Sequence, residues 1–487
     1  MPYIPRFMKV KQDTEFDYSC IRKRYTPIKP TNGTSITGLN GGSEIRFSYS
    51  GQDKFYRLSD PETGFLVKVA FRTQSGNPLA NARNGEITLA NDWFGYLFSS
   101  VRFNLGSVEL ENIQNPGVVC EVLNHMKSED FRTKAGENQG FIPDTDDGTS
   151  RSIVSVNNAA VAADAAIAAN ALCTAVPNEN YNAGFARRMK KYNYTLVPGA
   201  DDAATNAKIR YAEIFVPLSS IFGCCAENKL LKTINFEISL RRKVDDEYTE
   251  LFFGAANTGA HFRPGDATAN TGLVDITLNL VDYVPNPDAT VELNKIFSSE
   301  KINWTFKKRN CIKVGKTHSN EFTENKTSQE VPQLVLVVAK GTDGDAQQNG
   351  AVTRNFGFCR HANMQNVRVN LDGQNYPDQE QNGDFSNGQY STFYDQFRRA
   401  CYLFNGSDCA ITSSEYRDLY TIFAVDTSIK EFKTPNSTSN MTVSVKRRAV
   451  PADNATAVNP QDCEYYIVLL TEKSYNISCL EKLVTVA

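Results

Sequence analysis

The chain has 487 residues, of which 41% are hydrophobic and 11% aromatic. This composition is sufficient for well-packed cores and excludes a disordered protein. The net charge of −3, from 52 basic and 55 acidic residues, excludes a protein that binds nucleic acid through an overall basic charge.

The chain contains 11 cysteines, including the vicinal Cys224 and Cys225. Their number is odd, their spacing is irregular and no C-x-x-C pair occurs, so they do not form a disulfide framework. The first residues lack the apolar core of a signal peptide, and no run of about 18 apolar residues occurs that could span a bilayer. We therefore expect a soluble chain that is made inside the cell and keeps its thiols reduced.

Residues 1–44 are predicted to form an N-terminal arm. Within residues 1–30, seven basic side chains stand against three acidic ones. Two interpretations fit this charge: a solvated leader, or an arm that docks on a neighbouring subunit or on an acidic surface.

Short alternating or apolar runs bounded by Gly, Asn, Asp and Pro then follow, which is the pattern of an all-β protein. In the first half of the chain they predict strands at 64–73, 87–98, 234–243 and 273–284. In the second half they predict strands at 333–341, 419–427, 441–449 and 464–473.

Helical periodicity is confined to two short segments, 117–130 and 391–404. Between the two halves, Pro285 and Pro287 interrupt the strand pattern. We interpret this interruption as a linker.

The two halves repeat the same motifs, which indicates two related domains. In the clearest pair, "VRFNLGS" is followed much later by "VRVNLDG". The matched segments are 101–107 with 367–373, 65–70 with 335–339, 213–222 with 421–430, and 236–243 with 441–449.

Period-two alternation places every second residue of the clearest pair on a core face. The predicted equivalent core positions of the two halves are Val101, Phe103, Leu105, Val367, Val369 and Leu371. The residues that follow predict tight hairpin turns, type II′ at Gly106-Ser107 and type I′ at Asp372-Gly373.

The later repeats lie closer together, so the first half contains an insertion at about 141–205. This insertion holds the alanine tract 159–172, which has too few large apolar residues for a core helix. We expect a protruding surface loop.

Together these features predict an all-β protein with two tandem eight-stranded antiparallel jelly rolls, short helices and a long loop insertion in the first. The predicted domains are the arm at 1–44, a first jelly roll at 45–288 and a second at 289–487.

No motif predicts a catalytic residue, a cofactor site or a metal site. "VGKT" at 314–317 lacks the earlier glycine and the following helix of a phosphate-binding loop. "DTDDG" at 144–148 lacks the later glycine and glutamate of a calcium loop, which leaves a loosely bound surface cation open. Cys359 and His361 supply at most two ligands, so we expect a buried thiol beside a partly exposed imidazole. Carboxylate pairs of the glycosidase type stay open, because acids occur throughout the chain.

Basic clusters occur at 187–191, 307–309 and 446–448. No aromatic residues interleave with them as in a groove for single-stranded nucleic acid. We interpret them as surface or inter-subunit charge, and expect no specific nucleic-acid recognition.

Several longer stretches resemble one known family. They are "LFSSVRFNLGSVELE" (97–111) with "EVLNHM" (121–126), "NFGFCRHANMQNVRVNLDGQNYP" (355–377), and "YYIVLLTEKSYNISCLEKLVTV" (465–486). They resemble the double jelly-roll major capsid proteins of the PRD1/adenovirus lineage of DNA viruses, and are most similar to the Polinton, adintovirus and virophage types.

The resemblance implies a structural protein that is not an enzyme and needs no cofactor. Such chains form homotrimers whose six barrels make pseudo-hexagonal capsomers, and these tile an icosahedral shell. Implied partners are neighbouring capsomers and penton or minor capsid proteins, and the implied location is the virion, assembled inside the host cell. The insertion at 141–205 would form an outer tower, and the arm at 1–44 an inward-facing segment.

Two alternative functions remain open: a tandem β-sandwich protein that binds carbohydrate or mediates adhesion, and a β-sandwich hydrolase. Trp93 and Trp304 lie in different predicted elements, so the sequence shows no clustered aromatic platform for a glycan.

Overall fold

The fold is taken from a computed structural model of the chain. The structure describes residues 20–32, 43–51, 54–71, 87–145, 183–191, 210–243, 250–252, 272–317, 319–328, 330–341, 357–428, 439–448 and 463–486. Residues 20–285 are called the first half below, and residues 302–486 the second half. Within the described residues, every strand ladder joins strands of the same half.

The first half contains two antiparallel sheets and a short ribbon. In spatial order, the first sheet consists of β1 (Cys20–Ile28), β12 (Gly272–Pro285), β4 (Gly64–Phe71) and β8 (Arg210–Pro217), extended by β3 (Phe55–Tyr56) and β9 (Leu231–Lys232). The second sheet consists of β2 (Glu44–Tyr49), β10 (Phe236–Arg242), β6 (Phe98–Leu105) and β7 (Val108–Gln114). The ribbon pairs β5 (Ile87–Leu89) with β11 (Glu250–Phe252).

The second half repeats this plan. Its first sheet consists of β13 (Ile302–Lys316), β20 (Cys463–Ser478), β15 (Leu334–Gly341) and β18 (Phe423–Asp426), with β21 (Leu483–Val486) beside β20. Its second sheet consists of β14 (Glu321–Ser328), β19 (Ser439–Arg447), β16 (Met364–Leu371) and β17 (Gln374–Tyr376).

The strands matched by the sequence repeats hold corresponding places in these sheets. β4 and β15 are both third in the first sheets, β8 and β18 follow them, β10 and β19 are second in the other sheets, and β6 and β16 are third. This shared order confirms the prediction of two antiparallel, eight-stranded jelly rolls.

The two hairpins of the clearest repeat close with the predicted turns. Gly106 has a φ of 60°, as a type II′ turn requires at its first central residue. Asp372 and Gly373 have φ values of 51° and 90°, which fits type I′. Leu371 therefore pairs directly with Gln374 across the turn.

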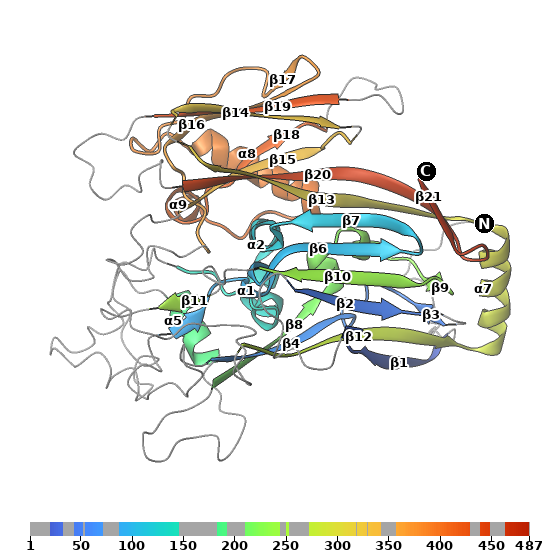
Figure 1. Ribbon diagram of the computed structural model, residues 1–487. Helices are drawn as coiled ribbons and strands as arrows, with labels where there is room; N and C mark the ends of the chain where they lie inside the picture. Colours follow the sequence, from blue (N-terminus) through green and yellow to red (C-terminus); the bar gives the residue numbers. More distant parts are fainter. Residues whose placement is uncertain are drawn as a thin grey trace, which may run out of the picture.

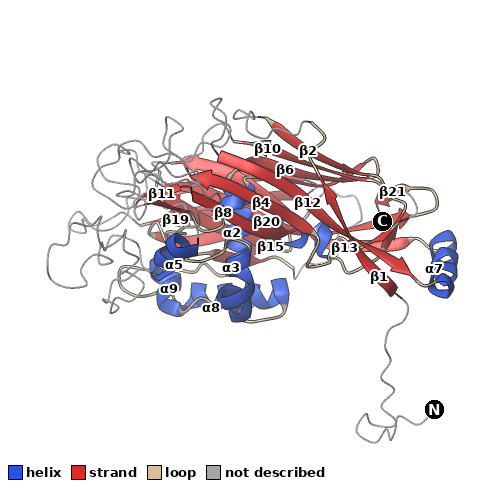
Figure 2. Cartoon of the chain, turned by 90° about the horizontal axis from the view of Figure 1, so that it is seen from below, coloured by secondary structure: helices blue, strands red, loops and turns tan. Residues whose placement is uncertain are grey.

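The helices are short and connect the strands. They are α1 (Trp93–Tyr96), α2 (Pro116–His125), η4 (Phe131–Ala135), α3 (Gly136–Asn138), α5 (Ala183–Lys191), α6 (Leu218–Ile221), η7 (Cys224–Ala226), α7 (Pro287–Ser299), α8 (Ser391–Asn405) and α9 (Ser413–Asp418). The predicted helices at 117–130 and 391–404 thus correspond to α2 and α8. Figure 2 shows α3, α5, α8 and α9 gathered toward one end of the strands, with α7 at the opposite end.

Four local predictions need correction. The predicted strand at 87–98 contains helix α1, because Asp92 adopts the left-handed conformation (φ 55°) and ends the strand. The predicted linker is helix α7, in which Asn286 caps the backbone N–H of Ala289 and Pro287 occupies the first turn, where its missing N–H costs nothing.

The third correction concerns the arm, since its residues 20–28 form edge strand β1. Residues 1–19 lie outside the described residues, as does the alanine tract 159–172. The described parts of the insertion are not a protruding loop, because Phe141, Ile142 and Arg188 are buried.

In Figure 1 the two halves lie one above the other with their strands roughly aligned, and β7 of the first half lies beside β13 of the second. β1 and β17 lie on opposite outer sides of the molecule. Within the described residues, none of the helices is long and apolar enough to cross a bilayer.

Candidate functional site

The six predicted core positions are all buried, three in β6 and three in β16. Exposed fractions do not exceed 4% at Val101, Phe103, Leu105, Val367, Val369 and Leu371. Both strands are third in their sheets, next to a hairpin partner. This placement supports the equivalence of the two sets, which stays a prediction.

The motifs that were considered for chemistry lie in strands or in packed surroundings. Gly315 of "VGKT" lies within strand β13 and no helix follows it. Cys359 is buried, whereas the ring of His361 stacks on Phe385 with centroids 4.8 Å apart. Across the described chain, no group of three or more His, Cys, Asp or Glu is placed to hold a metal ion.

The most elaborate polar site lies instead where the two halves meet. Glu111 of β7 is completely buried at the seam with β13. One of its carboxylate oxygens accepts the backbone N–H of Arg309 of β13 at 2.8 Å, and the other accepts the N–H of Cys224 at 3.0 Å. A side chain thus makes the contact between β7 and β13, and it satisfies two buried backbone donors, one on β13 and one on η7.

A bulge in β7 directs Glu111 to this seam. The register between β6 and β7 shifts between Phe103 and Asn104, and Leu110 is the extra residue. As a result Glu109 is exposed while Leu110 and Glu111 are both buried. Re-aiming a side chain is a common effect of a β-bulge.

A second contact across the junction is a buried ion pair. The Nζ atom of Lys340, on β15, lies 2.7 Å from Oε1 of Glu121, on α2, and both side chains are fully buried. The hydroxyl of Tyr96 donates to the other oxygen of Glu121, and Lys340 also lies 3.2 Å from the sulfur of Cys359. The charges are therefore paired and hydrogen-bonded, which a buried pair requires.

Further bonds join the connecting segments of the two halves. Arg132, just after α2, binds the carboxylate of Glu415 on α9 through both terminal nitrogens, at 2.5 and 3.2 Å. The hydroxyl of Tyr420 donates to the carbonyl of Asp144 at 2.7 Å, and Asp144 is itself paired with the buried Arg188.

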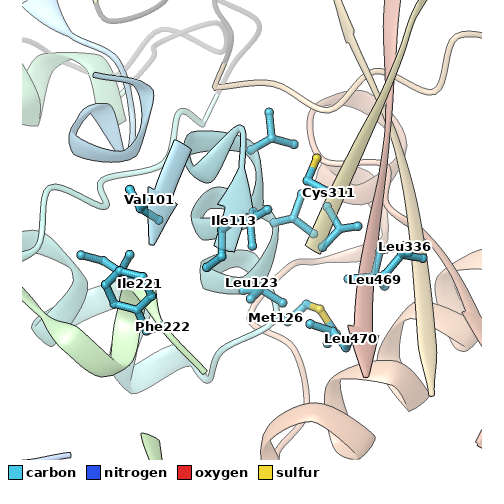
Figure 3. Close-up of a cluster of buried hydrophobic side chains, with 14 of the residues drawn as sticks. Val101, Ile113, Leu123, Met126, Ile221, Phe222, Cys311, Leu336, Leu469 and Leu470 are labelled. Atoms are coloured by element: carbon cyan, nitrogen blue, oxygen red, sulfur yellow. The ribbon is translucent and has the colours of Figure 1, made fainter. Parts of the chain in front are cut away.

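A cluster of buried apolar side chains also contains residues of both halves (Figure 3). First-half members of the cluster include Val101, Ile113, Leu123, Met126, Ile221 and Phe222. Second-half members include Cys311, Leu336, Leu469 and Leu470. The core is thus continuous across the junction, which favours a rigid two-barrel unit over two independently moving domains.

Each basic cluster contains one buried arginine that bonds within the chain, whereas Arg187, Lys446 and Arg448 are exposed, in line with our interpretation of the clusters as surface charge. Arg188 is buried against Asp144, and Arg309 donates to the carbonyls of Ser219 and Ser220 in the first half. Arg447 is buried and donates to the hydroxyl of Tyr465. Arginine suits such positions because its planar fork satisfies several acceptors at once.

Burial sets the ionisation of the junction. It raises the pKa of the Glu111 carboxyl and of the Glu121 carboxyl, in each case against the opposing effect of a nearby cation. Burial also raises the pKa of Asp92 to about 7, although the amide of Asn124 donates to its carboxylate at 2.7 Å. Burial holds the pKa of His125 well below its usual range, so this imidazole is neutral.

Sequence reasoning did not identify Glu111, Glu121 or Lys340. Each is a charged residue within or next to an apolar run: "VELENI", "GVVCEVL" and "LVLVVAK". A charge at a position that periodicity assigns to the core is the signal that could have marked them. Their partners in the other half lie more than 190 residues away, so pairing across the junction could not be deduced from spacing.

Comparisons with known proteins agree with this architecture. The sequence matches the model of one protein family, described as a double jelly roll-like domain, over residues 190–471, which is more than half of the chain. A search of curated proteins found no match.

Two solved structures illustrate the likeness of the fold. A chain from the cryo-EM structure of the Sputnik virophage aligns with a TM-score of 0.60 at 10% identity, covering 100% of this chain and 92% of that chain. The Faustovirus major capsid protein aligns with a TM-score of 0.50 at 10% identity, covering 96% of this chain and 92% of that chain. Identities this low relate the folds alone.

Proposed function

The chain belongs to the double jelly roll-like family, and we propose that it is a structural viral protein, the major capsid protein of an icosahedral shell. The proposal assigns it no catalytic reaction. It is supported by the strand order shared between the two halves and by the fold that it has in common with the Faustovirus major capsid protein.

The observation that carries the proposal is the buried junction. Glu111, the pair of Glu121 with Lys340, and the continuous apolar core hold two similar barrels side by side in one chain. Three such chains in a ring would present six similar barrels, which is the shape of a pseudo-hexagonal tile.

The division of labour along the chain is part of this proposal. The first jelly roll is proposed to end near residue 288 and the second to begin near 289, at the start of helix α7. The segment before β1 reaches adjacent tiles or the interior. Homotrimers then bind neighbouring capsomers and penton or minor capsid proteins, and the chain resides in the virion after assembly in the host cell.

The test is the assembly state of the purified full-length chain. We expect a trimer by analytical ultracentrifugation and hexagonal tiles by negative-stain electron microscopy. A monodisperse monomer that binds components of a glycan array would overturn the proposal and favour a carbohydrate-binding protein.

A further inference from the structure

The corresponding first sheets of the two halves are covered to different extents. In β15 of the second half, every residue from Leu334 to Ala339 is buried. In β4 of the first half, burial alternates, and Leu66 is 36% exposed between the buried Phe65 and Val67. Continuous burial means that both faces of a sheet are covered, whereas alternation means that one face is open.

The cover on the second half comes from the first half. Glu121 of α2 reaches Lys340 on the outer face of β15, and Glu111 of β7 reaches the backbone of β13. On β13, Arg309 and Cys311 are consequently only 5% and 4% exposed.

Within the part of the chain that the structure describes, the corresponding edge strand of the first half has no such cover. β1 lies next to β12 just as β13 lies next to β20. Yet Ile21 and Tyr25 of β1 are 64% and 57% exposed. Large apolar side chains on an edge strand are an association hazard unless a partner covers them.

The second half in turn presents an unused edge. β17 holds the place in its sheet that β7 holds in the other, at the end of the order β14-β19-β16-β17. β7 lies beside β13, whereas among the described strands none pairs with the outer side of β17. Figure 1 places β17 and β1 on opposite sides of the molecule.

We infer that Ile21 and Tyr25 on the face of β1 in one copy bind the β17 edge, residues 374–380, of a second copy. The contact repeats between copies the one that β13 and β7 make inside the chain. This inference rests on the proposed function, since it names the surfaces through which trimers close.

Charge and geometry agree with this pairing. Lys23, Arg24, Lys29 and Glu380 form ion pairs within the chain. Among the described residues Arg22 of β1 and Asp378 beside β17 take part in no ion pair, and they supply opposite charges on the two surfaces. Opposite charges on the two surfaces fix register and steer encounter. Ile21 and Tyr25 supply the apolar anchors that dominate binding energy in such interfaces. Because the two surfaces differ, the contact is heterologous and can close into a ring.

The test uses two variants of the full-length chain, I21S/Y25S and D378K/Q379K, which change exposed positions of one surface each. We expect each variant alone to sediment as a monomer with an unchanged circular dichroism spectrum. An equal mixture should form dimers and nothing larger, because one variant keeps an intact β17 edge and the other an intact β1 face. The matched control is L480S/V486S. It removes two apolar side chains that are 69% and 70% exposed and belong to neither of the two surfaces, so this variant should remain a trimer.

Each other outcome contradicts a specific step. If the unaltered chain is trimeric but either surface variant also stays trimeric, the assigned contact is wrong and the proposed function stands. If the mixture stays monomeric, the contact is not heterologous between these two surfaces. If the unaltered chain is itself monomeric at high concentration, the proposed function fails and this inference fails with it.

Discussion

The carboxylate of Glu111 accepts the backbone N–H of Arg309 at 2.8 Å, so that a single side chain bridges the seam between β7 and β13. Neighbouring edge strands usually pair through a ladder of backbone hydrogen bonds. Between β7 and β13 a side-chain carboxylate makes the contact instead. The other oxygen of the same carboxylate accepts the N–H of Cys224, within the first half. One buried side chain therefore satisfies two backbone donors at the junction, one from each half.

Replacing Glu111 with alanine is expected to lower the free energy of unfolding by about 2–4 kcal/mol, because two buried backbone donors lose their acceptor. The loss is measured by denaturant titration. The matched control is Glu109→Ala, which removes an exposed glutamate of the same strand and should change stability by less than about 0.5 kcal/mol. Equal effects of the two substitutions would contradict the role assigned to Glu111.

Replacing Lys340 with methionine is expected to cost about 3–5 kcal/mol, since it leaves the Glu121 carboxylate buried without its cation. The double variant K340M/E121Q should recover a large part of this loss, because both charges are then absent while an acceptor for Tyr96 remains. A double-mutant cycle in the same denaturant experiment gives the coupling energy. Additive effects of the two substitutions would show that the pair is not energetically linked.

The buried carboxyl of Asp92 predicts a pH dependence of stability. Its pKa is raised by burial from 3.8 to about 7, so the folded state holds a proton that the unfolded state releases. The stability from this group is fully present below pH 3.8 and is lost as pH rises toward 7.

Asp92→Asn should remove this dependence, because a neutral amide still accepts the bond from Asn124 and tolerates the left-handed backbone. We expect the variant to have a higher melting temperature than the unaltered chain at pH 8, and the same melting temperature at pH 4. The measurement is thermal unfolding at both pH values. A gain that is the same at both would show that ionisation of Asp92 is not its cause.

The strand pattern and the internal repeats were sufficient to predict both jelly rolls, because period-two burial and turn residues are local properties. Helix α7 was missed since Pro287 at a helix start looks the same in sequence as Pro287 in a linker. Glu111 was missed because its direction depends on the bulge at Leu110, and a single extra residue reverses the expected face. The junction as a whole depends on which surfaces of the two folded barrels meet, and no local sequence pattern encodes that choice.

If the predicted equivalence of the two cores holds, matched substitutions should cause matched losses of stability. Leu105 and Leu371 each end the core strand before a two-residue hairpin turn, and they are 0% and 4% exposed. Truncating either to alanine removes the same buried atoms and leaves a similar cavity, so we expect each to cost about 2–5 kcal/mol.

Because the apolar core is continuous through the junction, both losses should appear in one cooperative unfolding transition. The measurement is denaturant unfolding of L105A and L371A, with Arg102→Ala at an exposed position of β6 as the control for a change in the strand alone. If only one of the two leucine variants is destabilised, the two positions are not equivalent. Two separate transitions, with L105A shifting one and L371A shifting the other, would show that the barrels unfold independently in spite of the junction.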